Sequence, residues 1–146
     1  MRSAARSASG GYLLTSVARI ADFAERPVGV QSFDRTDWSD GDYVIADVTG
    51  GAPFLIESPS GRYVEVLSGD SIIGALGRRC ATLEVVGDWR AVGDDLVMHT
   101  LTSGGVLGRC TSASRPPPRM ATLRYRGHVT RDGRACAMRD FVAPPK

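Results

Sequence analysis

Gly41-Asp42-Tyr43-Val44-Ile45-Ala46 sets a Gly-Asp pair directly before a short apolar run, and the same arrangement returns twice. The other copies are Gly69-Asp70-Ser71-Ile72-Ile73-Gly74 and Gly93-Asp94-Asp95-Leu96-Val97-Met98. Glycine supplies a positive φ and aspartate bonds nearby backbone, so each pair predicts a turn that leads into a β-strand. Such signals recur about every ten residues. The pattern predicts an all-β fold, a small closed or nearly closed β-barrel.

The first part of the chain shows a different period. Residues 12–26 carry apolar side chains at helical spacing, and Pro27 follows them. Proline ends a helix at the preceding residue, so the pattern predicts one N-terminal helix. We expect this helix to plug one end of the barrel; a helix that docks onto a partner is the alternative.

The 146 residues are expected to form one domain over 12–142, with a disordered tail at 1–11 and a short tail at 143–146. Pro116, Pro117 and Pro118 predict an extended crossover within residues 112–119. Hairpin turns are expected at Ser58-Pro59-Ser60-Gly61 and at Arg131-Asp132-Gly133. The expected strands are 28–33, 43–48, 53–57, 63–66, 71–76, 81–86, 96–101, 107–110, 121–125, 128–130 and 135–138.

Charge is distributed unevenly, although the formal net charge is only +2. Residues 34–95 carry an excess of acidic side chains, and residues 109–146 carry an excess of basic ones. Acidic turns and solvated strand faces explain this pattern, and a basic binding face in the second half is the alternative. Nearly all basic residues are arginine, which indicates either the coding bias of a GC-rich genome or the binding of anions.

Cysteine and histidine positions argue against a metal site. Cys80, Cys110 and Cys136 are widely spaced, and neither His99 nor His128 lies near a pair of cysteines. We therefore expect free thiols in a reducing cytoplasm. No apolar run is long enough for a membrane span, so a cytoplasmic location is expected and a membrane partner is not.

Two Gly-Arg segments are the strongest candidates for a ligand site. Residues 69–79 combine three glycines with a carboxylate and two arginines, Arg78 and Arg79. Residues 100–109 combine a Thr-Ser-Gly-Gly turn, typical of an anion-binding nest, with Arg109. A glycine bulge at a barrel corner is the alternative explanation for the first segment. The candidate ligand-binding residues are Asp70, Gly77, Arg78, Ser103, Gly104, Gly105, Arg109 and His128.

The two segments also resemble each other, because Leu76-Gly77-Arg78 matches Leu107-Gly108-Arg109. An internal duplication would place the two glycine turns at equivalent positions. Both guanidinium groups would then converge on one anion, and the amides of residues 103–105 would add donors. The competing expectation is that both arginines are solvated and cover apolar surface with their stems.

Residues 123–131 alternate basic and aromatic side chains around Tyr125. This pattern is found in strands that bind single-stranded nucleic acid, where an aromatic ring stacks on a base. One aromatic residue is too few for such a platform, and we favour an edge strand protected by charge. Nucleic acid is therefore not the expected partner.

Catalytic pairs are available, but none has a distinctive spacing. Asp70 with His99 or His128 would make an acid–base couple, and Cys110 with His128 a nucleophile–base couple. A phosphate loop of the Walker type needs a lysine that residues 100–109 lack, and Ser103 does not lie in a Gly-x-Ser-x-Gly elbow.

Four phrases between Phe33 and Val142 carry a family resemblance: Gly-Asp-Tyr-Val-Ile-Ala-Asp-Val, Gly-Asp-Ser-Ile-Ile-Gly-Ala-Leu-Gly-Arg-Arg, Leu-Thr-Ser-Gly-Gly-Val-Leu-Gly-Arg and Tyr-Arg-Gly-His-Val-Thr-Arg-Asp-Gly-Arg. They resemble the N-terminal β-domain of uncharacterised bacterial proteins that carry a P-loop nucleotide-binding domain immediately afterwards. The chain ends where that domain would start. The resemblance thus implies an excised fragment or a standalone relative without the nucleotide site, and it transfers no functional residue.

The sequence favours a non-catalytic binding or regulatory β-domain for a partner protein or a small anionic ligand. A small biosynthetic enzyme with a pocket at the barrel mouth and a nucleic-acid-binding barrel are the alternatives. An enzyme would gather Asp70, His99, His128 or an arginine in a cleft, with shifted pKa values. A nucleic-acid binder would show a contiguous arginine face. The sequence leaves both the cofactor and the oligomeric state open.

Overall fold

The computed structural model describes residues 12–51, 54–81, 85–113 and 120–142. About half of these residues form strands, and their helical segments are 3-10 turns of three residues each: η2 (Ser16–Ala18), η3 (Arg35–Asp37), η4 (Trp89–Ala91) and η5 (Met138–Asp140). In this part of the chain no helix is long and apolar enough to cross a bilayer. The expected tails at 1–11 and 143–146, and residues 114–119 of the expected proline crossover, lie outside the described residues.

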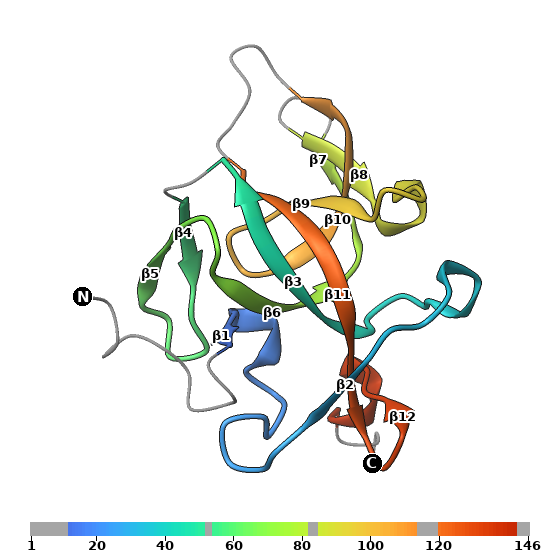
Figure 1. Ribbon diagram of the computed structural model, residues 1–146. Coiled ribbons are helices and arrows are strands. Elements are labelled where there is room, and N and C mark those ends of the chain that lie inside the picture. Colours follow the sequence, from blue (N-terminus) through green and yellow to red (C-terminus); the bar gives the residue numbers. More distant parts are fainter. Residues whose placement is uncertain (1–11, 52–53, 82–84, 114–119, 143–146) are drawn as a thin grey trace.

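Five strands pair in a closed ring (Figure 1). The path runs from β3 to β11, β9, β10 and β6, and β6 pairs with β3 again. All of these pairings are antiparallel except that between β6 and β10, which is parallel. The strands of the ring are β3 (Tyr43–Gly50), β6 (Ser71–Leu76), β9 (Val97–Thr100), β10 (Val106–Ala113) and β11 (Thr122–Arg131).

Shorter strands extend this ring. β1 (Leu13–Leu14) runs parallel to β6, whereas β2 (Gly29–Gln31) and β12 (Arg134–Ala135) pair with β11. Residues of β10 beyond the ring pair with β8 (Val85–Asp88), which pairs in turn with β7 (Arg78–Ala81). A separate hairpin consists of β4 (Phe54–Glu57) and β5 (Tyr63–Val66).

The alternation of side chains along β3 divides the core into two clusters. Val44, Ala46 and Val48 lie in a cluster that includes Met98, Leu107 and Leu123. Tyr43 and Ile45 point to the other face and lie in a cluster with Phe23 and Val129. This is the period of two that a strand buried on both faces requires.

The expected N-terminal helix over residues 12–26 is wrong. Leu13 and Leu14 pair with Ile72 and Ile73 as strand β1, and Thr15 Oγ1 donates to Ile73 O at 2.7 Å. Ile20, which lies on the expected buried face, is 45% exposed. The apolar spacing fits a helix, but Leu13 and Leu14 pair with β6 and the residues after Thr15 form only short turns, so tertiary pairing overrides the local preference.

The Gly-Asp turns are confirmed in two of the three copies. Gly41 and Gly69 have positive φ values of 82° and 95°. The carboxylates of Asp42 and Asp70 each accept a hydrogen bond from the amide three residues earlier, at 2.9 and 2.8 Å. In the third copy it is Leu96 that has the positive φ, 59°.

The strand predictions hold for most of the sheet. β5 and β6 begin and end as expected, and the two hairpin turns join β4 to β5 and β11 to β12. Of the strand expected at 81–86, Ala81 ends β7 and residues 85–86 begin β8, whereas residues 82–84 lie outside the described residues. The strands expected at 121–125 and 128–130 form a single strand, β11, with a register shift between Tyr125 and Gly127.

Buried Tyr43 predicts a pH dependence of stability. Its hydroxyl donates to Val17 O at 2.6 Å, and burial, with a smaller contribution from Cys136, raises the pKa of Tyr43 to about 12 from 10.0. Because the pKa of Tyr43 is higher in the folded than in the unfolded protein, its neutral hydroxyl stabilises the fold below a pH of about 10. This contribution to the free energy of unfolding is lost as pH rises from about 10 to 12. The free energy of unfolding should fall by roughly 2 kcal/mol more in the wild type than in Tyr43→Phe over this range. Urea unfolding across that range measures it, with exposed Tyr63→Phe as the control, whose pH profile should match the wild type.

Candidate functional site

A cleft of about 470 Å³ lies between the β4–β5 hairpin and the turn that joins β9 to β10. Its walls are mostly apolar, and two of its side chains, Leu55 and Tyr63, are 53% and 62% exposed. A concave apolar surface with a few polar groups is the usual form of a ligand site. The lining residues are Phe54, Leu55, Tyr63, Glu65, Arg79, Val85, Thr100, Leu101, Thr102, Ser103 and Met120.

The polar groups of the cleft come from separate elements. The Arg79 side chain on β7 donates through Nη1 to Leu101 O at 2.7 Å, which holds the guanidinium against the turn. Thr102 Oγ1 accepts from Val106 N at 3.2 Å, so its own proton is available to donate. Ser103 adds a second hydroxyl, and Glu65 on β5 adds an exposed carboxylate. The cleft therefore combines an apolar surface with a cation, an anion and hydroxyl donors.

The turn at residues 101–105 acts as a structural junction through its carbonyl groups. Ser103 O accepts from Glu57 N at 2.8 Å, Gly104 O from Val17 N at 3.0 Å, and Gly105 O from Ala75 N at 2.9 Å. The Gly105 amide donates to Thr102 O at 3.2 Å. Of the three residues expected to form an anion nest, Ser103 lines the cleft, whereas Gly104 and Gly105 tie the turn to its neighbours.

Asp70 and Gly77 also have local structural roles. The Asp70 side chain is buried and accepts from Leu67 N at the start of β6. Gly77 N donates to Leu107 O at 3.1 Å and its carbonyl accepts from Trp89 N at 3.0 Å, between β6 and β7. A Cβ on Gly77 would lie 2.8 Å from Val106 Cγ1, so this position leaves little room for a side chain.

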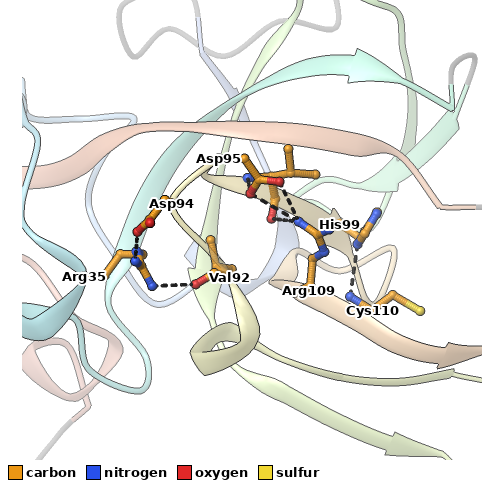
Figure 2. A network of polar contacts seen from close by, with 8 residues as sticks. Arg35, Val92, Asp94, Asp95, His99, Arg109 and Cys110 are labelled. Carbon is orange, nitrogen blue, oxygen red and sulfur yellow. Dashed lines mark hydrogen bonds and ion pairs between the residues drawn. The ribbon is translucent and has the colours of Figure 1, made fainter.

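Arg78 and Arg109 lie in separate ion pairs. Arg78 pairs with Asp40 at 3.3 Å, whereas Arg109 on β10 pairs with Asp95 at 3.3 Å and donates to Val97 O (Figure 2). β8 lies between β7 and β10, and its Asp88 is the register partner of Arg78 on β7 and of Arg109 on β10. A carboxylate thus lies between the two arginines in the register, and their convergence on one anion stays a prediction.

The two similar Gly-Arg segments do lie side by side. In the parallel pairing of β6 with β10, Leu76 stands opposite Leu107 and Ala75 opposite Val106. Equivalent leucines of the two phrases therefore occupy the same level of the ring. This register gives the two segments similar surroundings, and an internal duplication stays a prediction.

His128 belongs to a buried polar network that the sequence analysis missed. Its Nε2 lies 2.9 Å from Asp42 Oδ2, and its Nδ1 lies 2.6 Å from the Tyr125 hydroxyl. That hydroxyl accepts from Phe33 N at 3.1 Å, and the Trp38 ring packs against both Tyr125 and His128. The sequence analysis identified Asp42 only as a turn residue of the Gly-Asp phrase. It considered Tyr125 only as an aromatic ring that could stack on a base.

The two histidines have other partners than in the catalytic couples that the sequence makes available. His128 pairs with Asp42 instead of Asp70 or Cys110, and His99 Nδ1 accepts from Cys110 N at 3.0 Å (Figure 2). Burial, with a smaller effect of Arg109, lowers the pKa of His99. The three cysteines are free thiols, and within residues 12–51, 54–81, 85–113 and 120–142 no group of histidine, cysteine and acidic side chains could hold a metal ion.

Two of the three arginines of β11 pair with aspartates of other segments. Arg126 pairs with Asp47 at 2.7 Å and Arg131 with Asp22 at 2.7 Å, while the Tyr125 ring is buried. The interpretation of this stretch as an edge strand is wrong, because β11 pairs with β3, β9, β2 and β12. Its charges lie on a central strand.

Comparisons with known proteins give no match to a family model, a curated protein or a solved structure. The resemblance to the β-domain of P-loop proteins therefore stays a prediction. The cleft remains the best-supported candidate site, since it joins a ligand-sized volume to polar groups held by hydrogen bonds. Such a surface can bind the apolar body of a small molecule and hold its polar head at Arg79, Thr102 and Ser103.

Proposed function

We propose that this protein is a binding or regulatory β-domain whose ligand is a small amphipathic molecule held in the cleft. The closed ring of pairings supports an interpretation of the five strands as a small barrel, with the cleft beside the β9–β10 turn. The observation that carries the proposal is the cleft itself, about 470 Å³ with mostly apolar walls. Volumes of this size are typical of small-molecule sites.

The chemistry of the walls indicates the kind of ligand. Phe54, Leu101 and Met120 favour an alkyl chain or a ring, because burying apolar surface contributes about 25 cal/mol per Å². Arg79 and the Ser103 hydroxyl favour a head group that accepts hydrogen bonds, and a carboxylate suits a guanidinium best. The sequence predicted a small anionic ligand held by Arg78 and Arg109. The cleft favours a carboxylic acid with an apolar body, held by Arg79.

Binding is favoured over catalysis by the composition of the cleft. Neither His99 nor His128 is among the described residues that line the cleft. Asp42, which pairs with His128, is buried in the core. The nucleic-acid alternative needs a contiguous arginine face, whereas Arg78, Arg109, Arg126 and Arg131 each pair with an aspartate. The partner-protein alternative has no comparable observation in its favour.

Octanoate is the probe that tests this proposal. At 100 times its dissociation constant a ligand raises the free energy of unfolding by about 2.7 kcal/mol, so octanoate should raise the thermal midpoint of the wild type. Ser103→Phe places a ring in the cleft and should abolish the rise. Exposed Ser68→Phe, outside the cleft, should retain it.

The head group is tested by replacing Arg79. Arg79→Gln should weaken octanoate by about tenfold and leave 1-octanol unchanged, because a hydrogen bond to a charged group contributes about 1.5 kcal/mol or more. Equal midpoint shifts in the wild type and in Ser103→Phe would place the ligand elsewhere and contradict the proposal.

A further inference from the structure

A second concave site lies where two short 3-10 turns meet, and it holds both tryptophans of the chain. This hollow, about 330 Å³ in volume, is lined by residues of η3 and η4 and by residues directly before or after them. Within the described part of the chain it shares no lining residue with the cleft. The lining residues are Asp34, Arg35, Thr36, Trp38, Trp89, Arg90 and Val92.

The two sides of the hollow are tied together by polar contacts. Arg35 donates to Val92 O at 3.0 Å and pairs with Asp94, so that η3 is fixed to the loop after η4 (Figure 2). A second contact joins Trp89 Nε1 to the carboxylate of Asp40. The hollow is thus formed before any ligand arrives, which reduces the entropic cost of binding.

The tryptophan rings present an apolar aromatic surface to the hollow. Trp38 Nε1 donates to Phe33 O at 3.0 Å, and its ring packs on Tyr125 with centroids 4.4 Å apart. Trp89 is half-buried and packs against the same core cluster. Because Trp38 is only 5% exposed and packs on Tyr125, the half-buried Trp89 ring offers a ligand most of the aromatic surface, and Trp38 adds a small exposed part of its ring.

Two arginines supply positive charge beside these rings. The Arg90 guanidinium bonds Asp88 through Nε and Nη2, and no contact of its Nη1 occurs among the described residues. The acidic lining residue, Asp34, has its carboxylate engaged by the amide and hydroxyl of Thr36 at 3.0 and 2.8 Å. The wall therefore offers a ligand the Nη1 donor of Arg90, whereas its carboxylate already accepts hydrogen bonds, and this favours an anionic ligand over a cationic one.

We propose that this hollow binds a small aromatic anion, a planar ring that carries one carboxylate or phosphate group. The ring packs against Trp38 and Trp89, and the anionic group accepts hydrogen bonds from Arg90. Guanidinium groups and tryptophan rings together recognise this class of ligand, because one supplies charge and the other supplies stacking area. The site is independent of the cleft and of its proposed ligand.

Tryptophan fluorescence tests the proposal directly, because the chain has two tryptophans and both line the hollow. Phenyl phosphate should change the emission in a saturable way. Benzyl alcohol, which has the ring alone, and inorganic phosphate, which has the anion alone, should each bind at least about tenfold more weakly. Ser103→Phe should leave the phenyl phosphate titration unchanged, which separates this site from the cleft.

Variants of the wall identify the contacts. Arg90→Gln should weaken phenyl phosphate by about tenfold and have little effect on benzyl alcohol, whereas Arg62→Gln, an exposed arginine outside the hollow, should bind as the wild type does. Trp89→Leu should weaken both ring-bearing probes when binding is followed by calorimetry. No saturable change with phenyl phosphate, or full affinity in Arg90→Gln, would overturn the proposal.

Discussion

Asp42→Ala is expected to lower the free energy of unfolding by about 3–5 kcal/mol, the largest effect of any side chain considered above. Asp42 and His128 are 3% and 1% exposed, and they lie 86 positions apart in the chain. Removing the carboxylate leaves the buried imidazole Nε2–H without its acceptor and also releases Ser39 N. Unmade hydrogen bonds in a buried site cost their full desolvation penalty. Urea unfolding at neutral pH measures the effect.

Asp47→Ala is the matched control, because Asp47 also pairs with a basic residue of β11. The Arg126–Asp47 pair is partly solvated, with side chains 45% and 35% exposed. Its loss should cost less than about 1 kcal/mol, as for other surface pairs. Equal losses in the two variants would show that the Asp42–His128 contact adds nothing beyond an ordinary surface pair.

Gly105→Ala should be the second most damaging change, with a loss of about 3 kcal/mol. Gly105 has a φ of 103°, where a side chain is strained, and a Cβ there would overlap Oγ1 and Cβ of Thr15. Thr15 is itself fixed, since its hydroxyl donates to Ile73 O. The substitution would thus push the N-terminal segment away from the β9–β10 turn. Thermal and urea unfolding measure the loss.

Gly61→Ala separates backbone strain from crowding. Gly61 has a similar positive φ, 87°, but a Cβ there would have no neighbour within 4 Å. Its replacement should cost about 1 kcal/mol, the strain alone. If Gly105→Ala costs no more than Gly61→Ala, the close packing of Thr15 on the turn is not a source of stability.

Local signals predicted the turns and most strands, because those depend on a few adjacent residues. Gly41 and Gly69 have the expected positive φ, and Asp132-Gly133 forms the expected hairpin turn. The N-terminal helix failed, because Leu13 and Leu14 satisfy a helical spacing and a strand equally well, and pairing with β6 decides between them. Periodicity alone cannot distinguish these outcomes in a short apolar segment.

The candidate site was predicted less well, because its walls come from distant parts of the chain. Of the eight candidate residues only Ser103 lines the cleft; Arg79, which also lines it, was named with Arg78 in the first Gly-Arg segment but is not one of the eight. The Gly-Arg phrases stood out because glycine permits close backbone approach, and Gly105 and Gly77 do serve packing. The partner of His128 could not be found from spacing, since the fold alone brings it to Asp42.

The most direct test of the cleft as a ligand site is a titration with octanoate of protein labelled at its leucine and methionine methyl groups, followed by NMR. The account predicts saturable shifts confined to the lining residues Leu55, Leu101 and Met120, and no such shifts in Ser103→Phe. Methyl groups of Leu13 and Leu123, buried away from the cleft lining, should keep their positions. Absence of saturable shifts at the lining residues, or shifts that persist in Ser103→Phe, would contradict it.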